Sequence, residues 1–121
     1  MLNAMNFQIR GRRGEDEVRG LTRQVDIAGG ALRLNETEAA ALSLAFERAG
    51  GPDVPVEIGL REAADAAGVT EAASRRAFRS LERRGLLAVE ERYGADGGRR
   101  ANAYALTVMG ALAAAAIRNE Q

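Results

Sequence analysis

The sequence of 121 residues has no cysteine and no histidine. These two absences remove disulfides, thiolate nucleophiles, imidazole bases and the ligands that zinc sites use most often. Most enzyme mechanisms thereby lose their best side chains. The carboxylates of Glu36, Glu38 and Glu47 follow the exposed part of an amphipathic pattern rather than a catalytic pair. We therefore predict a protein that is not an enzyme and that holds neither a metal ion nor another cofactor.

Aromatic residues and long apolar runs are also scarce. The chain has three phenylalanines, two tyrosines and no tryptophan, although 46% of its residues are hydrophobic. A single core of modest size must therefore be built mostly from leucine, valine, isoleucine and alanine. No apolar run approaches the roughly 18 to 20 residues of a membrane span, and the N-terminus lacks the basic-then-apolar pattern of a signal peptide. These absences predict a cytoplasmic protein with no membrane partner.

Lysine is absent too, so all 17 basic residues are arginines, and they balance 17 acidic residues. Their distribution is uneven: residues 71–100 carry eight arginines against five acids, whereas residues 35–70 carry two against seven. Arginine suits bidentate contacts to phosphate and guanine. The positive excess in residues 71–100 therefore favours a nucleic-acid surface there. An arginine-for-lysine bias from a GC-rich genome is an alternative reason for the missing lysines.

Residues 70–84 predict an amphipathic helix with two different faces. At about 100° per residue, the apolar side and the cationic side fall opposite one another. The apolar side holds Ser74, Ala77, Phe78 and Leu81, and the cationic side holds Arg76, Arg79 and Arg83. We expect Phe78 and Leu81 in the core and the arginines outside it. A solvated face paired locally with Glu82 is the alternative.

The flanking segments predict the order of elements around this helix. Residues 60–68 form a short alanine-rich amphipathic segment that ends at a glycine, and two residues lead from it into the arginine helix. Strand-like alternation starts at residues 85–87, is interrupted by the glycine-rich residues 94–98 and resumes at residues 101–106. A helix-turn-helix followed by a β-hairpin is the layout of a winged helix. Duplex DNA is the partner that this layout predicts.

The N-terminal half predicts a second hairpin and another helix. Residues 25–27 and 32–34 flank a glycine pair and form a hairpin pattern. Asn35 with Glu38 forms a capping-box start, and the helix that follows ends at Gly50. We expect an α+β fold: a winged helix-turn-helix with a three-helix core, a β-hairpin wing, an extra N-terminal β-hairpin and a C-terminal helix. Residues 1–24 are expected to be an arm or edge strand, residues 25–121 the domain, and residues 107–119 its last helix.

Three motifs carry a resemblance to a known fold family. Residues 63–70 resemble the second helix and turn of winged helix-turn-helix regulators of the MarR, ArsR and PadR types. Residues 80–87 are similar to their "rLeerGLv" end of the recognition helix, and residues 104–110 to their "Y.LT..G" exit from the wing, where Thr107 can cap the last helix. The resemblance covers about half of the chain and implies a DNA-binding domain of a transcriptional regulator.

The chain also departs from this family. Ser74 stands where the family usually buries an aliphatic residue, and Ala72 and Ala73 replace the serine and threonine that commonly touch DNA. The long N-terminal dimerisation helix of MarR proteins is missing, and the hairpin at residues 25–34 is more similar to the β-platform of response-regulator effector domains. The residues that we expect to contact DNA are Thr70, Ala72, Arg75, Arg76, Arg79 and Arg83 at the helix, with Arg99 and Arg100 in the wing.

The last predicted helix bears on assembly. Residues 108–117 include no charged or strongly polar side chain, and a helix that is apolar all round needs cover on more than one face. A homodimer supplies that cover and places two recognition helices on a two-fold site. The residues expected at this interface are Met109, Leu112, Ala113, Ala116 and Ile117. The alternative is a helix packed in a groove of its own monomer.

The sequence thus predicts sequence-specific binding of duplex DNA by a dimeric transcriptional regulator, and it names no small-molecule effector. Two other functions stay open at this point. One is a winged helix used for protein–protein contact in a larger assembly, which the zero net charge and the two alanines at the helix start favour. The other is a replication or partition factor of a plasmid or phage.

Overall fold

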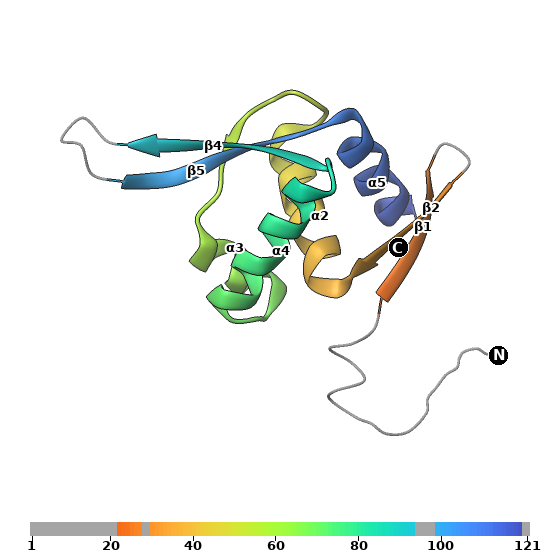
Figure 1. Ribbon diagram of the computed structural model, residues 1–121, viewed down its shortest axis with the longest axis horizontal. Helices are drawn as coiled ribbons and strands as arrows, with labels where there is room; N and C mark the ends of the chain where they lie inside the picture. Colours follow the sequence, from red (N-terminus) through yellow and green to blue (C-terminus); the bar gives the residue numbers. More distant parts are fainter. Residues whose placement is uncertain (1–21, 28–29, 94–98, 120–121) are drawn as a thin grey trace, which may run out of the picture.

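The computed structural model describes residues 22–27, 30–93 and 99–119. The described elements are, in chain order, β1 (Thr22–Ile27), β2 (Gly30–Asn35), α2 (Glu36–Ala49), β3 (Val56–Glu57), α3 (Leu60–Ala67), α4 (Glu71–Arg83), β4 (Leu87–Tyr93), β5 (Arg99–Leu106) and α5 (Val108–Asn119) (Figure 1). The strands form a two-stranded sheet, β1-β2, and a three-stranded antiparallel sheet in the order β3-β5-β4. The predicted order of elements is confirmed.

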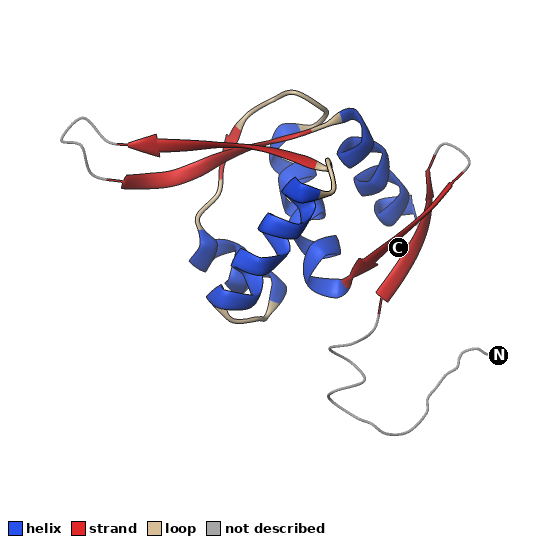
Figure 2. Ribbon diagram, in the orientation of Figure 1, coloured by secondary structure: helices blue, strands red, loops and turns tan. Residues whose placement is uncertain are grey.

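The architecture is an α+β winged helix-turn-helix. Helices α2, α3 and α4 form the helical core, and the β4-β5 hairpin projects from one end of it as the wing (Figure 2). The β1-β2 hairpin lies at the other end and is the extra N-terminal hairpin. Residues 22–24, which the sequence assigned to the N-terminal segment, already pair with β2. The rest of that segment, residues 1–21, lies outside the described residues.

Local signals start and end the helices where the sequence predicted. The Asn35 side chain accepts the backbone N–H of Glu38 at 2.7 Å, and the Glu38 carboxylate accepts the backbone N–H of Asn35 at 2.9 Å. This reciprocal capping box begins α2, which ends at Gly50. Thr70 caps α4 with a single hydrogen bond, in which its Oγ1 accepts the N–H of Ala73 at 3.1 Å.

The core confirms the helical phase assigned to α4. Phe78 and Leu81 are 3% and 0% exposed. The Phe78 ring contacts the ring of Tyr104 on β5, with centroids 4.5 Å apart and planes tilted by 34°. Leucines from α2, α4, β4 and β5 complete this core: Leu42, Leu81, Leu87 and Leu106. Helix α4 is therefore held by its apolar side, and its cationic side points away from the core.

Helix α5 lies between α2 and the β1-β2 hairpin (Figure 1). Ala113 and Ile117 are 0% and 1% exposed within the single chain. Their assignment to a dimer interface is wrong, because the hairpin supplies the second cover that the prediction assigned to another copy: Val25 and Ile27 of β1 are buried in the same cluster. Within the described part of the chain, no helix has both the length and the apolar character needed to cross a membrane.

A close backbone contact joins the end of α4 to the start of α5. Gly85 has φ of +77°, a left-handed conformation that glycine adopts easily. Thr107 donates its hydroxyl to the Gly85 carbonyl at 2.7 Å, and it accepts the N–H of Gly110 at 3.0 Å, which confirms that it caps α5. A Cβ on Gly110 would lie 1.9 Å from the Leu86 carbonyl oxygen. The two motifs at residues 80–87 and 104–110 therefore contact each other in the fold.

Replacing Gly110 by alanine tests this contact. The added methyl group meets a backbone carbonyl rather than a flexible side chain, so we expect the free energy of unfolding to fall by about 1 to 3 kcal/mol. At an unconstrained helical position the same change would stabilise by up to about 1 kcal/mol. Urea unfolding measures the sign, and a Gly110→Ala protein that is more stable than wild type would contradict the close approach.

Candidate nucleic-acid interface

The outward face of α4 gathers four exposed cations. The buried side of the helix consists of Ser74, Ala77, Phe78 and Leu81. The opposite side carries the exposed residues Arg75, Arg76, Arg79 and Arg83. The helical period that buries the apolar set therefore exposes the four arginines to solvent over about two turns.

No carboxylate of the described residues neutralises these four arginines. Within residues 22–27, 30–93 and 99–119, no salt bridge joins any of them to a carboxylate, and local pairing with Glu82 is not seen. Guanidinium groups stay protonated at any ordinary pH and offer five N–H donors each. The face is therefore a set of open cations in a geometry suited to bidentate acceptors.

The other predicted contact residues lie at the start of α4 and in the wing. Thr70 is exposed, and because its oxygen accepts the Ala73 N–H, its hydroxyl proton stays available to a second acceptor. Ala72 is exposed in the first turn. Arg99 and Arg100 occupy β5 opposite Tyr93 and Arg92 in the hairpin register. Their side chains lie outside the described part of the structure.

Sequence reasoning missed an ion pair between the two helices of the helix-turn-helix. The Nε of Arg61, in the first turn of α3, lies 3.2 Å from Oε2 of Glu71 at the first position of α4. The Arg61 side chain is 83% exposed and the Glu71 side chain 45%. Since the two residues are on different helices, helical periodicity gave no signal for the pair. It lies at the same end of α4 as Thr70 and Ala72.

A buried carboxylate fixes α4 to the rest of the domain. Glu38 was expected on an exposed face, but it is 6% exposed, so that expectation is wrong. Its Oε2 accepts the Ser80 hydroxyl at 2.7 Å, and its Oε1 lies 3.4 Å from the Arg84 guanidinium, which also donates to the Arg33 carbonyl. The buried charge is tolerated because partners from α4 and from its own capping box satisfy it.

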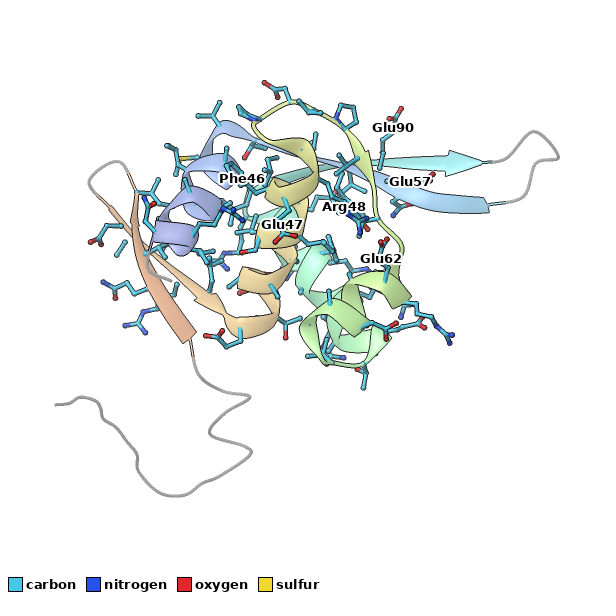
Figure 3. The ribbon with its side chains drawn as sticks, turned by 180° about the vertical axis from the view of Figure 1, so that it is seen from behind. Phe46, Glu47, Arg48, Glu57, Glu62 and Glu90 are labelled. Atoms are coloured by element: carbon cyan, nitrogen blue, oxygen red, sulfur yellow. The ribbon has the colours of Figure 1, made fainter. Side chains whose placement is uncertain are left out.

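Another ion pair lies on the face seen from behind in Figure 3, where Arg48 and Glu62 point toward one another. Arg48 also donates to the Glu57 carbonyl, and the Gly59 N–H donates to Glu62. The hydrogen bond from Arg48, followed by that from Gly59, holds the pKa of Glu62 below its ordinary value; the same bond raises the pKa of Arg48. This contact joins the end of α2 to the start of α3 and so fixes the helix-turn-helix from its other side.

Solved structures share this fold at low sequence identity. The chain is similar to ZitR of Lactococcus lactis, solved in complex with DNA, with a TM-score of 0.56 and 16% identity over 80% of this chain and 59% of that one. It is also similar to MepR, a transcription regulator of the Staphylococcus aureus multidrug efflux pump MepA, with a TM-score of 0.50 and 21% identity over 72% of this chain and 56% of that one. The likeness is one of fold.

The chain spans less than two thirds of the length of each of these two proteins. No protein-family model matches it, and no curated protein matches it either. The shared part is the winged helix-turn-helix described above. The specific chemistry of the site therefore rests on the residues of this chain.

The Glu38 contacts generate a stability prediction. Glu38→Ala removes the capping box, the acceptor of the Ser80 hydroxyl and the ion pair with Arg84, so we expect the free energy of unfolding to fall by about 2 to 4 kcal/mol. Glu47→Ala is the matched control, because it removes the same charge from the same helix at an exposed ion pair 4.0 Å long. That control should cost less than about 1 kcal/mol. Equal losses in the two variants, measured by urea unfolding, would contradict a special role for Glu38.

Proposed function

We propose that the protein binds duplex DNA through α4 and the wing and acts as a transcription regulator. The observation that carries the proposal is the row of four exposed arginines on the outward face of the second helix of the helix-turn-helix, with no carboxylate partner among the described residues. In this fold that helix enters the major groove. An open cationic face at this place matches the negative potential of the groove and its phosphate walls.

The order of residues along α4 divides their expected roles. Arg75, Arg76 and Arg79 lie nearer the N-terminal end of α4 than Arg83, and the N-terminal residues of a recognition helix are those that reach base edges. A guanidinium reads guanine through O6 and N7, whereas a contact to phosphate carries no sequence information. Arg83, in the last turn, is placed for phosphate. The wing arginines, Arg99 and Arg100, are proposed to contact phosphate or the minor groove beside it.

The remaining apolar surface supports a homodimer. The exposed large hydrophobic residues of the described chain are Val54, Val108, Met109 and Leu112. Val54 lies in the loop before β3, and the other three residues lie on α5. The Asp53 N–H donates to the Leu106 carbonyl at 2.9 Å, so this loop lies beside the start of α5 and the four residues belong to one region. We propose that a second copy covers this surface, with Met109, Leu112 and the half-buried Ala116 at the contact. A two-fold pair then presents two α4 helices to a symmetric site.

The first test is the loss of DNA affinity on arginine replacement. Arg76→Ala and Arg79→Ala should each weaken binding to a selected site by about 1 to 3 kcal/mol if the side chain reads a base. Arg118→Ala removes the same charge from the end of α5 and should leave binding nearly unchanged. Fluorescence anisotropy on the selected site and on random duplex separates the cases: an equal loss on both assigns the residue to phosphate. If neither variant weakens binding while both stay folded, the proposed DNA face is wrong.

The second test concerns the dimer. Leu112 is 45% exposed in the single chain, so Leu112→Glu should still fold, but in a dimer it would bury an unpaired carboxylate at high cost. We expect a monomer in sedimentation at micromolar concentration, and a larger loss of affinity for a paired site than for a half-site. Asn119→Glu adds the same charge at the exposed end of α5 and should stay dimeric. A monomeric wild-type protein would overturn the dimer.

A further inference from the structure

We infer that Glu71 is a sequence-reading residue for a cytosine, and that Arg61 positions it and joins it to the DNA backbone. This inference rests on the proposed DNA-binding function and adds to it a specificity determinant on the first turn of α4. A negative charge is unexpected on a surface that faces DNA. Glu71 is an exposed carboxylate at the helix start, where phosphates would repel it unless it were neutralised or used.

The position of Glu71 places it with the residues that face the groove. It is the first residue of α4, and Arg75 follows it by four residues, so the two side chains are neighbours on one helix face. The next two residues, Ala72 and Ala73, have no polar side-chain atoms. Glu71 is therefore the residue of the first helical turn that can form a hydrogen bond to a base edge. The methyl group of Ala72 can make only an apolar contact with a thymine methyl.

The ion pair between Arg61 and Glu71 leaves atoms of both side chains available for hydrogen bonds to DNA. Only Oε2 of Glu71 bonds to Arg61, through Nε at 3.2 Å; among the described residues Oε1 has no partner. A carboxylate oxygen can only accept, and the base that offers a lone donor at the edge of the major groove is cytosine, through its N4 amino group. The two terminal amino groups of Arg61 make no hydrogen bond within the described chain, and its side chain is 83% exposed. They are free to donate to a phosphate oxygen.

The pair also explains how the face keeps both affinity and selectivity. Arg61 cancels the charge of Glu71, so the four arginines of α4 keep their net attraction for DNA. An isolated carboxylate would lower affinity for every sequence alike. Held against α3 by Arg61, it instead penalises any base that presents an acceptor at that place, because two acceptors would then face each other without a proton.

The experiment compares base preferences of wild type and Glu71 variants at the selected half-site, with every base pair replaced in turn. Wild type should prefer a C·G pair at one position by about 5- to 150-fold. Glu71→Ala should remove that preference and keep or raise affinity for random duplex. Glu71→Gln should shift the preference toward adenine, which a carboxamide reads through N6 and N7. Glu82→Ala, which removes an exposed charge near the other end of α4, is the control and should leave all preferences unchanged.

The outcomes distinguish this inference from the proposed function. If wild type selects a site but Glu71→Ala binds all sequences tighter by one factor with unchanged preferences, Glu71 only repels DNA and the inference is wrong. Arg61→Ala should lower the slope of log affinity against log salt by about 0.9, the value for one lost phosphate contact; an unchanged slope would overturn the role given to Arg61. A wild-type protein that shows no binding to any duplex would instead reject the proposed function itself.

Discussion

The orientation of α4, which carries the candidate site, depends on the hydrogen bonds that the buried Glu38 carboxylate accepts. Glu38 completes the cap of α2 and accepts the hydroxyl of Ser80 and the guanidinium of Arg84 from α4 and the residue after it. Hydrogen bonds to an ionised group are stronger and shorter than those between neutral groups. In the low dielectric of the protein interior they also hold the bonded side chains in one orientation. Rotation of α4 about its axis would break them. The direction in which the arginine face points is therefore tied to the start of another helix.

Sequence signals between neighbouring residues predicted the helices and strands. They could not predict contacts between residues that are far apart in the chain. The capping box at Asn35, the cap at Thr107 and the burial of Phe78 and Leu81 are confirmed, because each depends on neighbours three or four residues away. Glu38 was misplaced because its deciding partners lie 42 and 46 residues later. A glutamate at the third position of a helix looks solvent-exposed until another helix packs over it.

The last helix shows a related limit. Its apolar sequence correctly required cover on two sides, and the hairpin that provides the second cover was itself predicted. The sequence did not show that this hairpin packs on α5, because the apolar pattern of a segment does not identify the segment against which it packs. Burial of Ala113 and Ile117 against β1 and α2 leaves a narrower outward strip, centred on Met109 and Leu112. The expected contact residues of α4 and the wing remain predictions.

The zero net charge of the chain is compatible with a cationic face because the acids lie mainly elsewhere: residues 35–70 carry seven acids and two arginines, whereas residues 71–100 carry eight arginines and five acids. In the described residues, Glu38, Glu47, Glu62 and Glu71 each lie within 4.0 Å of an arginine on another element or in the loop after one. These pairs connect helices to one another and leave the arginines of α4 facing solvent. Total charge therefore says little about the local field that a groove of DNA would meet.

The contact of Gly110 with the Leu86 carbonyl leaves no room for a hinge between α4 and α5. The end of α4, the base of the β4-β5 hairpin and the first turn of α5 are held together, because Thr107 donates to the Gly85 carbonyl and accepts the Gly110 N–H. In the proposed dimer, the distance between the two α4 helices then depends on the contact made by the outer strip of α5 and the adjacent Val54. Substitutions on that strip could change the spacing of the half-sites that the protein accepts while the residues that read each half-site stay the same.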